Sequence, residues 1–254
     1  MRAFTRAVSS RLAECQLTHL DRVPIDPVKA AEQHTAYEAA LAGAGFEIVR
    51  LPELPDDPDA VFVEDTALLL GEHAVITRPG APSRADEVHS TAEGLAGYFQ
   101  VHWIDRGYVD GGDVLRIGQK LYVSRSTRTD AEGIAALAEL VTPLGYSVVE
   151  AQLRDCLHLK TGTTYIGDGV LLYSERSIDP AQFVAPEPVA TLEPDAANCV
   201  RAGDRLILAA GNPQTASMLR EHGFHVVEVD VSELQKAEAG VTCMSLIDDR
   251  REHQ

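Results

Sequence analysis

Hydrophobic and polar positions follow a pattern that recurs along the chain. Each copy contains a helical stretch, an apolar strand, a short segment with polar side chains, and a glycine-led turn into a second apolar strand. The turn and second strand are clearest in "GEHAVI", "GQKLYV", "GDGVLL" and "GDRLIL", which lie roughly 45 residues apart, a spacing typical of repeat architectures. Any α/β protein alternates helices and strands, but the repeated glycine turns favour true repetition.

Predicted helices open four of the five copies, at residues 26–45, 83–99, 130–145 and 212–223. The first has Asp26 as its N-cap and Pro27 at its first position, both favourable at a helix start. The fourth copy, around "PVATLEP" and "AANCVRA", is shorter, and the fifth ends without its closing strand. Because the N-terminal "MRAFTRAVS" has the alternation to supply that strand, we predict a closed ring of five α/β units.

Radial repetition places the equivalent polar segment of every unit side by side at the centre of the ring. These segments contain Glu64 and Asp65, Asp110 and Asp113, His158, Asn198 and Cys199, and Cys243. Carboxylates, an imidazole and a thiol are therefore expected to converge on one central cavity. The pair Glu64 and Asp65 lies among strong β-formers, so at least one carboxylate should point to a buried face and require a partner.

Such a set of side chains indicates a specific chemistry. A thiol beside an imidazole permits nucleophilic catalysis, because a histidine can lower the thiol pKa or relay its proton. A carboxylate next to the imidazole fixes its tautomer and stabilises its charged form. Further carboxylates suit a planar cation, since a guanidinium presents its donors in a fork that matches carboxylate oxygens. The set therefore indicates attack by sulfur on a guanidinium carbon.

Several of these residues also have a structural interpretation. A lone cysteine in an apolar run is more often a small buried hydrophobe than a nucleophile, and Cys15, Cys156 and Cys199 keep that interpretation. For Cys243, the position within the repeat favours a functional role. The segment "DGGDV" at 110–114 predicts a turn, in which glycines let the backbone approach a ligand closely.

Composition narrows the classes of partner. The 39 acidic and 22 basic residues give a net charge of −17, which argues against nucleic acid and anionic membrane surfaces and weakly favours a cationic substrate. No segment approaches the ~20 apolar residues of a membrane span, so we expect a cytoplasmic protein. The four cysteines form no C-x-x-C pair, which argues against disulfides and structural zinc.

A metal site is an alternative use of the central residues. His158, Asp110 and Cys243 are the candidate ligands, but no closely spaced pair of the H-E-x-x-H kind supports a metal. The proposed sulfur chemistry requires neither a metal nor a cofactor, and we predict none.

The chain also resembles a known family. The motifs "FVED", "DGGDV", "HLKT", "AANC" and "CMSL", together with "ITRPGAPSR", resemble in order those of the dimethylarginine dimethylaminohydrolases, within the wider guanidine-modifying superfamily. The resemblance covers nearly the whole chain. It implies a five-bladed α/β propeller of ββαβ-type units around a central active-site cavity, formed by residues 1–254 as a single catalytic domain. It also implies hydrolysis of an Nω-methylated arginine to citrulline and a methylamine, by a monomer or a homodimer, of which we favour the homodimer.

The resemblance implies a role for individual residues. Cys243 is the expected nucleophile, His158 the expected general acid and base, and Asp110 the residue that orients His158, although some relatives have glutamate there. The substrate contacts implied by the resemblance are Asp59, Glu64 and Asp65 for the guanidinium, Arg84 and Arg128 for the α-carboxylate, and Leu20 and Ala237 for further contacts.

Position 160 bears on the choice of substrate. Arginine deiminases, a related family, typically have an aspartate two residues after the catalytic histidine, where it contacts the guanidinium. Lys160 occupies that position in "HLKT", and a lysine cannot bind a cation, which favours a methylated substrate. Two alternatives remain: a hydrolase of another guanidine, and a non-catalytic arginine-analogue binding or redox protein in which Cys243 is merely reactive.

Overall fold

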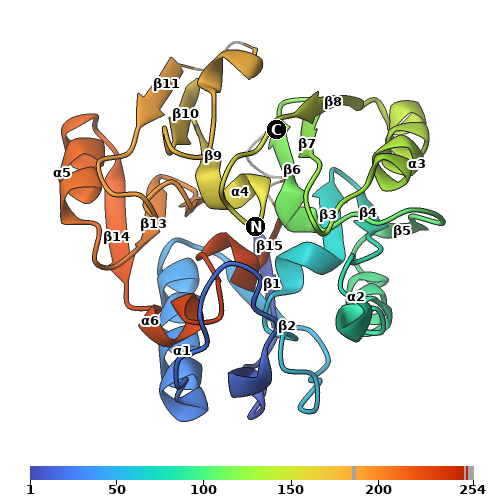
Figure 1. Ribbon diagram of the computed structural model, residues 1–254, viewed down its shortest axis with the longest axis horizontal. Coiled ribbons are helices and arrows are strands. Elements are labelled where there is room, and N and C mark those ends of the chain that lie inside the picture. Colours follow the sequence, from blue (N-terminus) through green and yellow to red (C-terminus); the bar gives the residue numbers. More distant parts are fainter. Residues whose placement is uncertain (185–186, 249, 251–254) are drawn as a thin grey trace.

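Five small sheets surround a common centre in the computed structural model, which describes residues 1–184, 187–248 and 250 (Figure 1). Each sheet has three strands, in the orders β15-β1-β2, β3-β4-β5, β6-β7-β8, β9-β10-β11 and β12-β13-β14. In every sheet the middle strand pairs antiparallel with one neighbour and parallel with the other. The predicted five-bladed α/β propeller is therefore confirmed.

The strands are short and similar in length. The first two sheets contain β15 (Leu246–Asp248), β1 (Arg2–Thr5) and β2 (Glu47–Arg50), and β3 (Ala67–Leu70), β4 (His73–Ile76) and β5 (Gln100–Trp103). The third contains β6 (Val114–Ile117), β7 (Lys120–Ser124) and β8 (Ser147–Ala151). The last two contain β9 (Thr163–Gly167), β10 (Val170–Tyr173) and β11 (Glu187–Ala190), and β12 (Cys199–Ala202), β13 (Arg205–Ala209) and β14 (His225–Val229).

A helix connects the parallel strands in four sheets, as the sequence predicts. These helices are α1 (Pro27–Gly43), α2 (Glu87–Leu95), α3 (Ala131–Val141) and α5 (Pro213–Glu221). In the remaining sheet, the described residues between β10 and β11 form only the 3₁₀ helix η6 (Pro180–Gln182). The described part of the chain contains no helix that is long and apolar enough to cross a membrane.

Local sequence sets the helix ends. The side chain of Asp26 accepts hydrogen bonds from the backbone N–H groups of Val28 and Lys29, so the predicted N-cap of α1 is confirmed. The α3 helix stops before the predicted end of its range, because Pro143 cannot continue an α-helix and lies in the 3₁₀ helix η5 (Thr142–Leu144). Three further short helices are η1 (Leu12–Glu14), η3 (Pro82–Arg84) and α6 (Ser232–Gln235).

The ring closes through the two ends of the chain. Strand β1 pairs antiparallel with β15, with Ala3 opposite Ile247, and parallel with β2. The N-terminal segment therefore supplies the strand that the fifth copy lacks, as predicted. Each sheet combines the last two strands of one sequence copy with the first strand of the next, so no blade is a contiguous copy, and neighbouring copies are tied together.

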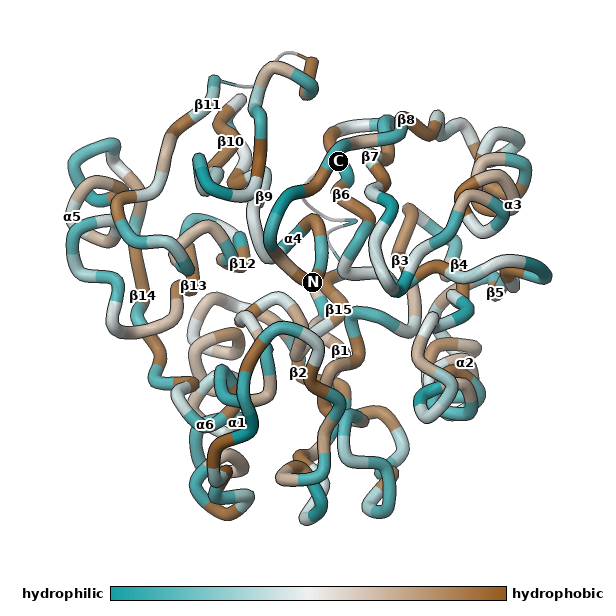
Figure 2. Tube along the Cα trace, in the orientation of Figure 1, coloured by the Kyte–Doolittle hydropathy of each residue, from teal (hydrophilic) through white to brown (hydrophobic). Residues whose placement is uncertain are grey.

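Hydrophobic side chains fill the space between neighbouring blades. Helix α3 contributes Leu137 to a buried cluster that also contains Leu70 of β3 and Leu121 of β7, so this cluster joins two sheets. Hydrophobic residues recur along the strands in Figure 2, for example in β14. This packing holds the innermost strands, and the turns that precede them, at fixed positions around the centre.

Four of the polar segments form tight turns, each followed by the strand of its sheet that lies nearest the centre: β3, β6, β9 or β15. They form η2 (Val63–Thr66), η4 (Gly111–Asp113), α4 (Leu159–Gly162) and η7 (Thr242–Met244). The prediction that at least one carboxylate of the pair Glu64 and Asp65 is buried is confirmed. A strand would point neighbouring side chains to opposite faces, whereas the 3₁₀ turn η2 buries both carboxylates.

Arg6, just after β1, connects the sheet β15-β1-β2 to the neighbouring blade. Its side chain is fully buried, and its guanidinium donates to the carbonyl oxygens of Pro52 and Ala60 and to the hydroxyls of Ser90 and Thr91 at 2.8–3.1 Å. Burial lowers the pKa of Arg6 to about 10, and nearby Glu87 opposes this effect. The contacts therefore satisfy a desolvated charge and connect β1 to α2.

We expect Arg6→Met to lower the free energy of unfolding by about 3 kcal/mol, because four acceptors, two of them in buried pairs, lose their donor. Urea unfolding followed by circular dichroism measures the change. Arg11→Met is the matched control, since the Arg11 side chain is half exposed and solvent-exposed ion pairs such as that with Glu14 contribute little to stability. Equal losses for the two variants would contradict this role of Arg6.

Candidate active site

Cys243 lies in the turn η7, directly before the inner strand β15. The residue is partly buried, and its Sγ accepts a hydrogen bond from the backbone N–H of Gly240 at 3.4 Å. Burial raises the pKa of the Cys243 thiol, and the carboxylates of Glu64 and Asp65 raise it further. Cys243 is therefore a protonated thiol at neutral pH, and a cation placed beside it would favour the thiolate.

His158 occupies the N-cap position of α4, and its imidazole is buried. Nε2 lies 3.2 Å from Asp110 Oδ2, within hydrogen-bond distance, and Nδ1 lies 3.8 Å from Asp65 Oδ1. Burial alone would lower the pKa of His158, but Asp65, the hydrogen bond to Asp110 and the charge of Asp113 outweigh burial and raise it to about 9. The imidazole is therefore protonated at neutral pH and can act as an acid.

The glycines of "DGGDV" allow the turns to approach one another. A Cβ added to Gly111 would lie 2.0 Å from the carbonyl oxygen of Glu64, and one added to Gly112 would lie 2.6 Å from His158 Nδ1. The Gly112 N–H also donates to Asp65 Oδ1 at 3.1 Å. The predicted bend is present, and its glycines make room for the side chains of His158 and Asp65.

Asp65 and Arg84 form a buried ion pair at 2.6 Å. Burial raises the pKa of Asp65, but His158 and Arg84 outweigh this effect and lower it. Arg84 also pairs with Glu87 at 2.8 Å and donates to the carbonyl of Phe62. An incoming carboxylate would therefore compete with two internal carboxylates for Arg84.

Glu64 is committed to internal partners. Its Oε1 pairs with Lys160 Nζ at 2.7 Å, and its Oε2 accepts from the Thr242 hydroxyl at 2.7 Å. Asn198 completes this network, because its side chain donates to Lys160 O and Thr242 Oγ1 and accepts from the Thr242 N–H. These bonds hold the turn that carries Cys243. Asn198 and Thr242 received no role from the sequence, although Asn198 stands at the repeat position equivalent to Asp65.

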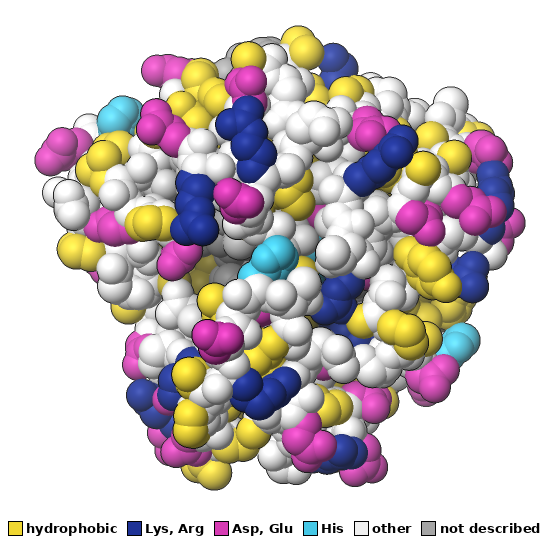
Figure 3. Space-filling model, in the orientation of Figure 1, with side chains coloured by type: hydrophobic (Ala, Val, Ile, Leu, Met, Phe, Trp, Pro, Cys, Tyr) yellow, Lys and Arg dark blue, Asp and Glu magenta, His cyan; other side chains and the backbone are white. Residues whose placement is uncertain are grey.

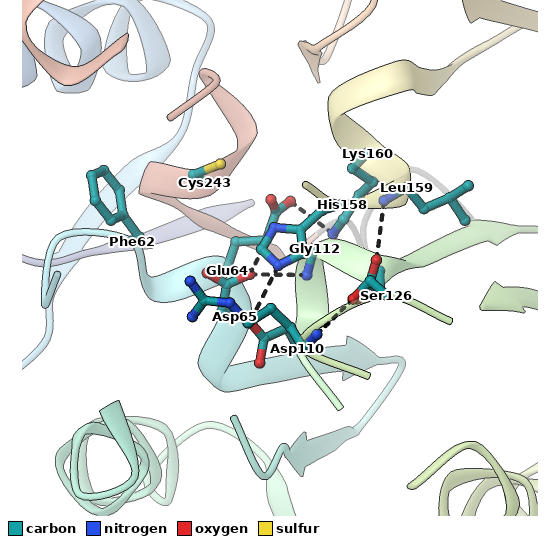
Figure 4. Close-up of polar contacts among 12 residues, drawn as sticks. Phe62, Glu64, Asp65, Asp110, Gly112, Ser126, His158, Leu159, Lys160 and Cys243 are labelled. Atoms are coloured by element: carbon teal, nitrogen blue, oxygen red, sulfur yellow. Dashed lines mark hydrogen bonds and ion pairs between the residues drawn. The ribbon is translucent and has the colours of Figure 1, made fainter. Parts of the chain in front are cut away.

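A cavity of about 30 Å³ lies between these groups. Its lining includes seven of the predicted site residues: Asp59, Asp65, Arg84, Arg128, His158, Ala237 and Cys243. Figure 4 shows the sulfur of Cys243 turned toward the imidazole of His158 across this space. Asp110 lies behind His158, and Glu64 lines a separate cavity of about 230 Å³. The sequence therefore predicts most of the lining.

A larger cavity of about 840 Å³ adjoins the small one. Both are lined by Leu157, Glu238 and Ala239, and the larger one is also lined by Leu20, which is half exposed. The face shown in Figure 3 is hollowed near its centre, with acidic and basic side chains around the hollow. A space of about 30 Å³ holds little more than a water molecule, so a larger ligand requires these walls to move.

Two further predicted residues contact the segment at residues 16–20. Asp59 accepts from the backbone N–H of Gln16, and burial raises its pKa although Arg84 opposes this effect. Arg128 Nη2 donates to Thr18 Oγ1 at 3.1 Å. The Glu238 carboxylate, which no sequence pattern indicates, accepts from the backbone N–H groups of residues 18–20. These bonds hold residues 16–20 in place, with Gln16 at the small cavity and His19 and Leu20 at the larger one.

The carboxylates and the imidazole also have the chemistry of metal ligands. Asp65, Asp110 and His158 present ligand atoms that all lie within 4.8 Å of one another. Cys243, a ligand in the sequence-based alternative, does not belong to this group among the described residues. The three side chains already bond to one another and to Arg84 and Gly112, which accounts for their proximity without an ion.

Comparison with known proteins places this site in a family. No family model matches the chain. The N(G),N(G)-dimethylarginine dimethylaminohydrolase of Streptomyces coelicolor is 40% identical over 248 residues, which cover 96% of each chain. A Pseudomonas aeruginosa structure of this enzyme, a cysteine-to-serine variant complexed with citrulline, aligns with a TM-score of 0.90 at 34% identity and covers 96% of this chain and 98% of the other.

A second solved structure of this enzyme, a histidine-to-glycine variant as an adduct with S-methyl-L-thiocitrulline, aligns equally well, with a TM-score of 0.90 at 35% identity and the same coverage. A thiol and a carboxylate-bound imidazole at the centre of a five-bladed propeller define a cysteine-dependent hydrolase that acts on guanidino groups. The chain belongs to the dimethylarginine dimethylaminohydrolase family.

Proposed function

We propose that this protein hydrolyses Nω-methylated arginine to citrulline and a methylamine through a covalent intermediate on Cys243. The observation that carries this proposal is the cavity shared by Cys243 and His158, in which Asp65 and Asp110 keep the imidazole protonated. The related structures support it, because their variants replace a cysteine and a histidine and hold citrulline or a thiocitrulline adduct.

The first half of the reaction forms the carbon–sulfur bond. The substrate guanidinium binds beside Asp59 and Asp65, and its positive charge stabilises the Cys243 thiolate, whose proton leaves to solvent. The sulfur attacks the guanidinium carbon. His158 then donates its proton to the methylated nitrogen, the carbon–nitrogen bond breaks, and the methylamine leaves. A thiouronium cation on Cys243 and a neutral His158 remain.

The second half returns the enzyme to its starting state. Neutral His158 takes a proton from a water molecule as the water oxygen attacks the thiouronium carbon. The carbon–sulfur bond breaks, the sulfur leaves as the thiolate, and the oxygen-bound proton passes to solvent to give citrulline. As citrulline departs, the thiolate regains a proton from solvent. Asp110 and Asp65 stabilise the imidazolium that forms at this step.

We assign the other predicted residues by asking whether internal partners already occupy their side chains. Arg128 is our first choice for the α-carboxylate, because its side chain donates to the neutral hydroxyl of Thr18, whereas Arg84 holds two carboxylates. Ala237 lies in the wall of the small cavity, and Leu20, which lines the larger cavity, stays a predicted contact. Glu64 acts mainly through Lys160 and Thr242.

A citrulline assay on dimethylarginine, monomethylarginine and arginine tests the proposal. We expect turnover of at least one methylated substrate well above that of arginine. Higher turnover of arginine would instead identify a deiminase, and binding without citrulline release would identify a binding protein.

We also propose, from the sequence, that the protein is a cytoplasmic homodimer. Light scattering on the purified chain tests whether it is a dimer.

The Lys160–Glu64 ion pair gives a prediction about substrate choice. We expect Lys160→Met to raise the ratio of kcat/KM for arginine to that for dimethylarginine about tenfold, because a freed Glu64 can accept from N–H groups that methylation removes. Lys236→Met is the matched control, since Lys236 pairs with Glu233 at the same 2.7 Å and does not contact Glu64. An unchanged ratio in Lys160→Met would contradict a role of Lys160 in the choice between arginine and dimethylarginine.

A further inference from the structure

Asp113 is a fully buried carboxylate to which no step above assigns a role. It ends the turn η4 and stands in one of the polar segments that the repeat brings to the centre. Its Oδ1 accepts from Ser124 Oγ at 2.7 Å and from the backbone N–H of Leu159 at 3.2 Å, and its Oδ2 accepts from Ser126 Oγ at 2.5 Å. Two of these contacts lead to different halves of the active site.

The Leu159 contact leads to the general acid. Leu159 directly follows His158 at the start of α4, so the bond fixes the backbone from which the imidazole extends. Asp110 and Asp65 hold the ring nitrogens, whereas Asp113 holds the main chain beside the ring. The three carboxylates thus restrain His158 from different sides, and the Asp113 charge also helps to keep the imidazole protonated.

The Ser126 contact leads to the substrate-binding arginine. Ser126 Oγ accepts from the backbone N–H groups of Arg128 at 2.9 Å and Thr129 at 3.2 Å. Because a hydroxyl oxygen has two acceptor sites, its own proton is left for Asp113. This arrangement shapes the turn that presents Arg128 to the cavity. Thr129 Oγ1 in turn accepts from the Asp110 N–H at 3.1 Å.

We propose that Asp113 is a positioning residue that couples the two halves of the site, with one oxygen fixing the backbone beside His158 and the other fixing the turn that carries Arg128. This inference rests on the proposed function. An asparagine cannot replace Asp113, because its NH₂ group would face either the Leu159 N–H or the Ser126 hydroxyl, whose acceptor sites are already filled.

A matched pair of serines tests the substrate-binding branch. Ser126→Ala removes the bond that shapes the arginine turn, and we expect KM for dimethylarginine to rise about tenfold with kcat within about threefold of wild type. Ser124→Ala also removes a bond to Asp113, but Ser124 contacts neither the backbone beside His158 nor the turn that carries Arg128. We therefore expect its KM and kcat to stay within about threefold of wild type. Equal effects of the two variants would overturn the role of Asp113 in placing Arg128.

Asp113→Asn tests the catalytic branch. We expect KM to rise, kcat to fall about a hundredfold, and the pKa of His158 to fall, because one of its flanking charges is lost. The charged or titratable groups around His158 are Asp65 and Arg84 in η2 and η3, Asp110 and Asp113 at η4, Cys243 in η7, Cys156 beside the His158 carbonyl, and Asp59, Arg128 and Glu238 in the cavity lining. The pKa is read from NMR titration of the imidazole, which needs no turnover.

The outcomes separate this inference from the proposed function. A wild type that releases no citrulline would overturn the function, whereas an active wild type whose Ser126→Ala variant matches Ser124→Ala would overturn only the inference. An unshifted His158 titration in a folded Asp113→Asn variant would remove the catalytic branch. If Asp113→Asn does not fold, the serine pair still decides the substrate-binding branch.

Discussion

Replacing Cys243 by serine should lower citrulline formation from dimethylarginine by at least about a thousandfold. A serine hydroxyl is a far weaker acid than a thiol, and it needs a strong base to become a nucleophile. His158 cannot serve as that base at neutral pH, because Asp65 and Asp110 keep it protonated, with a pKa of about 9. Initial rates of citrulline release measure the loss, and mass spectrometry of quenched reactions reports the adduct on Cys243, which should form only in the wild type.

Cys156→Ser is the matched control for this loss. Cys156 is a partly buried free thiol near the site, and it donates to the carbonyl oxygen of His158 at 3.4 Å. Burial raises its pKa to about 11, and Cys156 does not line the cavity in which a bound guanidinium would favour a thiolate. We expect Cys156→Ser to retain activity within about threefold of wild type. Turnover that survives Cys243→Ser but is lost in Cys156→Ser would contradict the assignment of Cys243 as the nucleophile and would identify Cys156 instead.

The ring could be predicted because its signal is repeated. A glycine-led turn before an apolar strand is weak evidence once, but four copies at similar spacing restrict the geometry. The convergence of Asp65, Asp110, His158 and Cys243 follows from that register alone, and closure by β1 follows from the strand missing in the last copy. These features depend on local pattern and on topology.

Partner choice within the site could not be predicted from the same pattern. The sequence treats Asp59, Glu64 and Asp65 as equivalent acceptors for a guanidinium. In the structure Lys160 neutralises Glu64 and Arg84 neutralises Asp65, at 2.7 and 2.6 Å. Which carboxylate meets which cation depends on side-chain directions set by tight turns, and the repeat pattern does not specify these directions. The burial of each carboxylate and the cation it pairs with therefore determine its role, which the residue type alone does not specify.

Replacing His158 by asparagine should reduce kcat for dimethylarginine by about 10²–10⁴-fold. The variant removes the proton donor for the departing methylamine and the base that activates water. It also leaves the buried carboxylates of Asp65 and Asp110 without their cationic partner. The two roles can be separated with S-methyl-L-thiocitrulline, because a thiolate leaves without prior protonation. With this analogue we expect the adduct on Cys243 to form and then persist, since the second step still lacks its base.

The wild type should show the titration of His158 in its pH profile. Because the pKa of His158 is raised from the ordinary 6.5 to about 9, the imidazolium is present at neutral pH and is lost as pH rises through 9. We expect kcat to fall above about pH 9, and Asp65→Asn to move this fall to lower pH. The same shift stabilises the fold, fully so below pH 6.5, and this contribution is lost as pH rises through 9.

The exposed His222 at the end of α5 supplies the control, and His222→Asn should leave the rate and the high-pH limb unchanged. A His158→Asn variant that releases citrulline at the wild-type rate would contradict the acid and base roles together. Rapid turnover of the thiocitrulline analogue without adduct would contradict the second role only, and another group would then have to activate water. The carboxylate oxygen at hydrogen-bond distance from the imidazole belongs to Asp110, so Asp110→Asn would be the next variant to test.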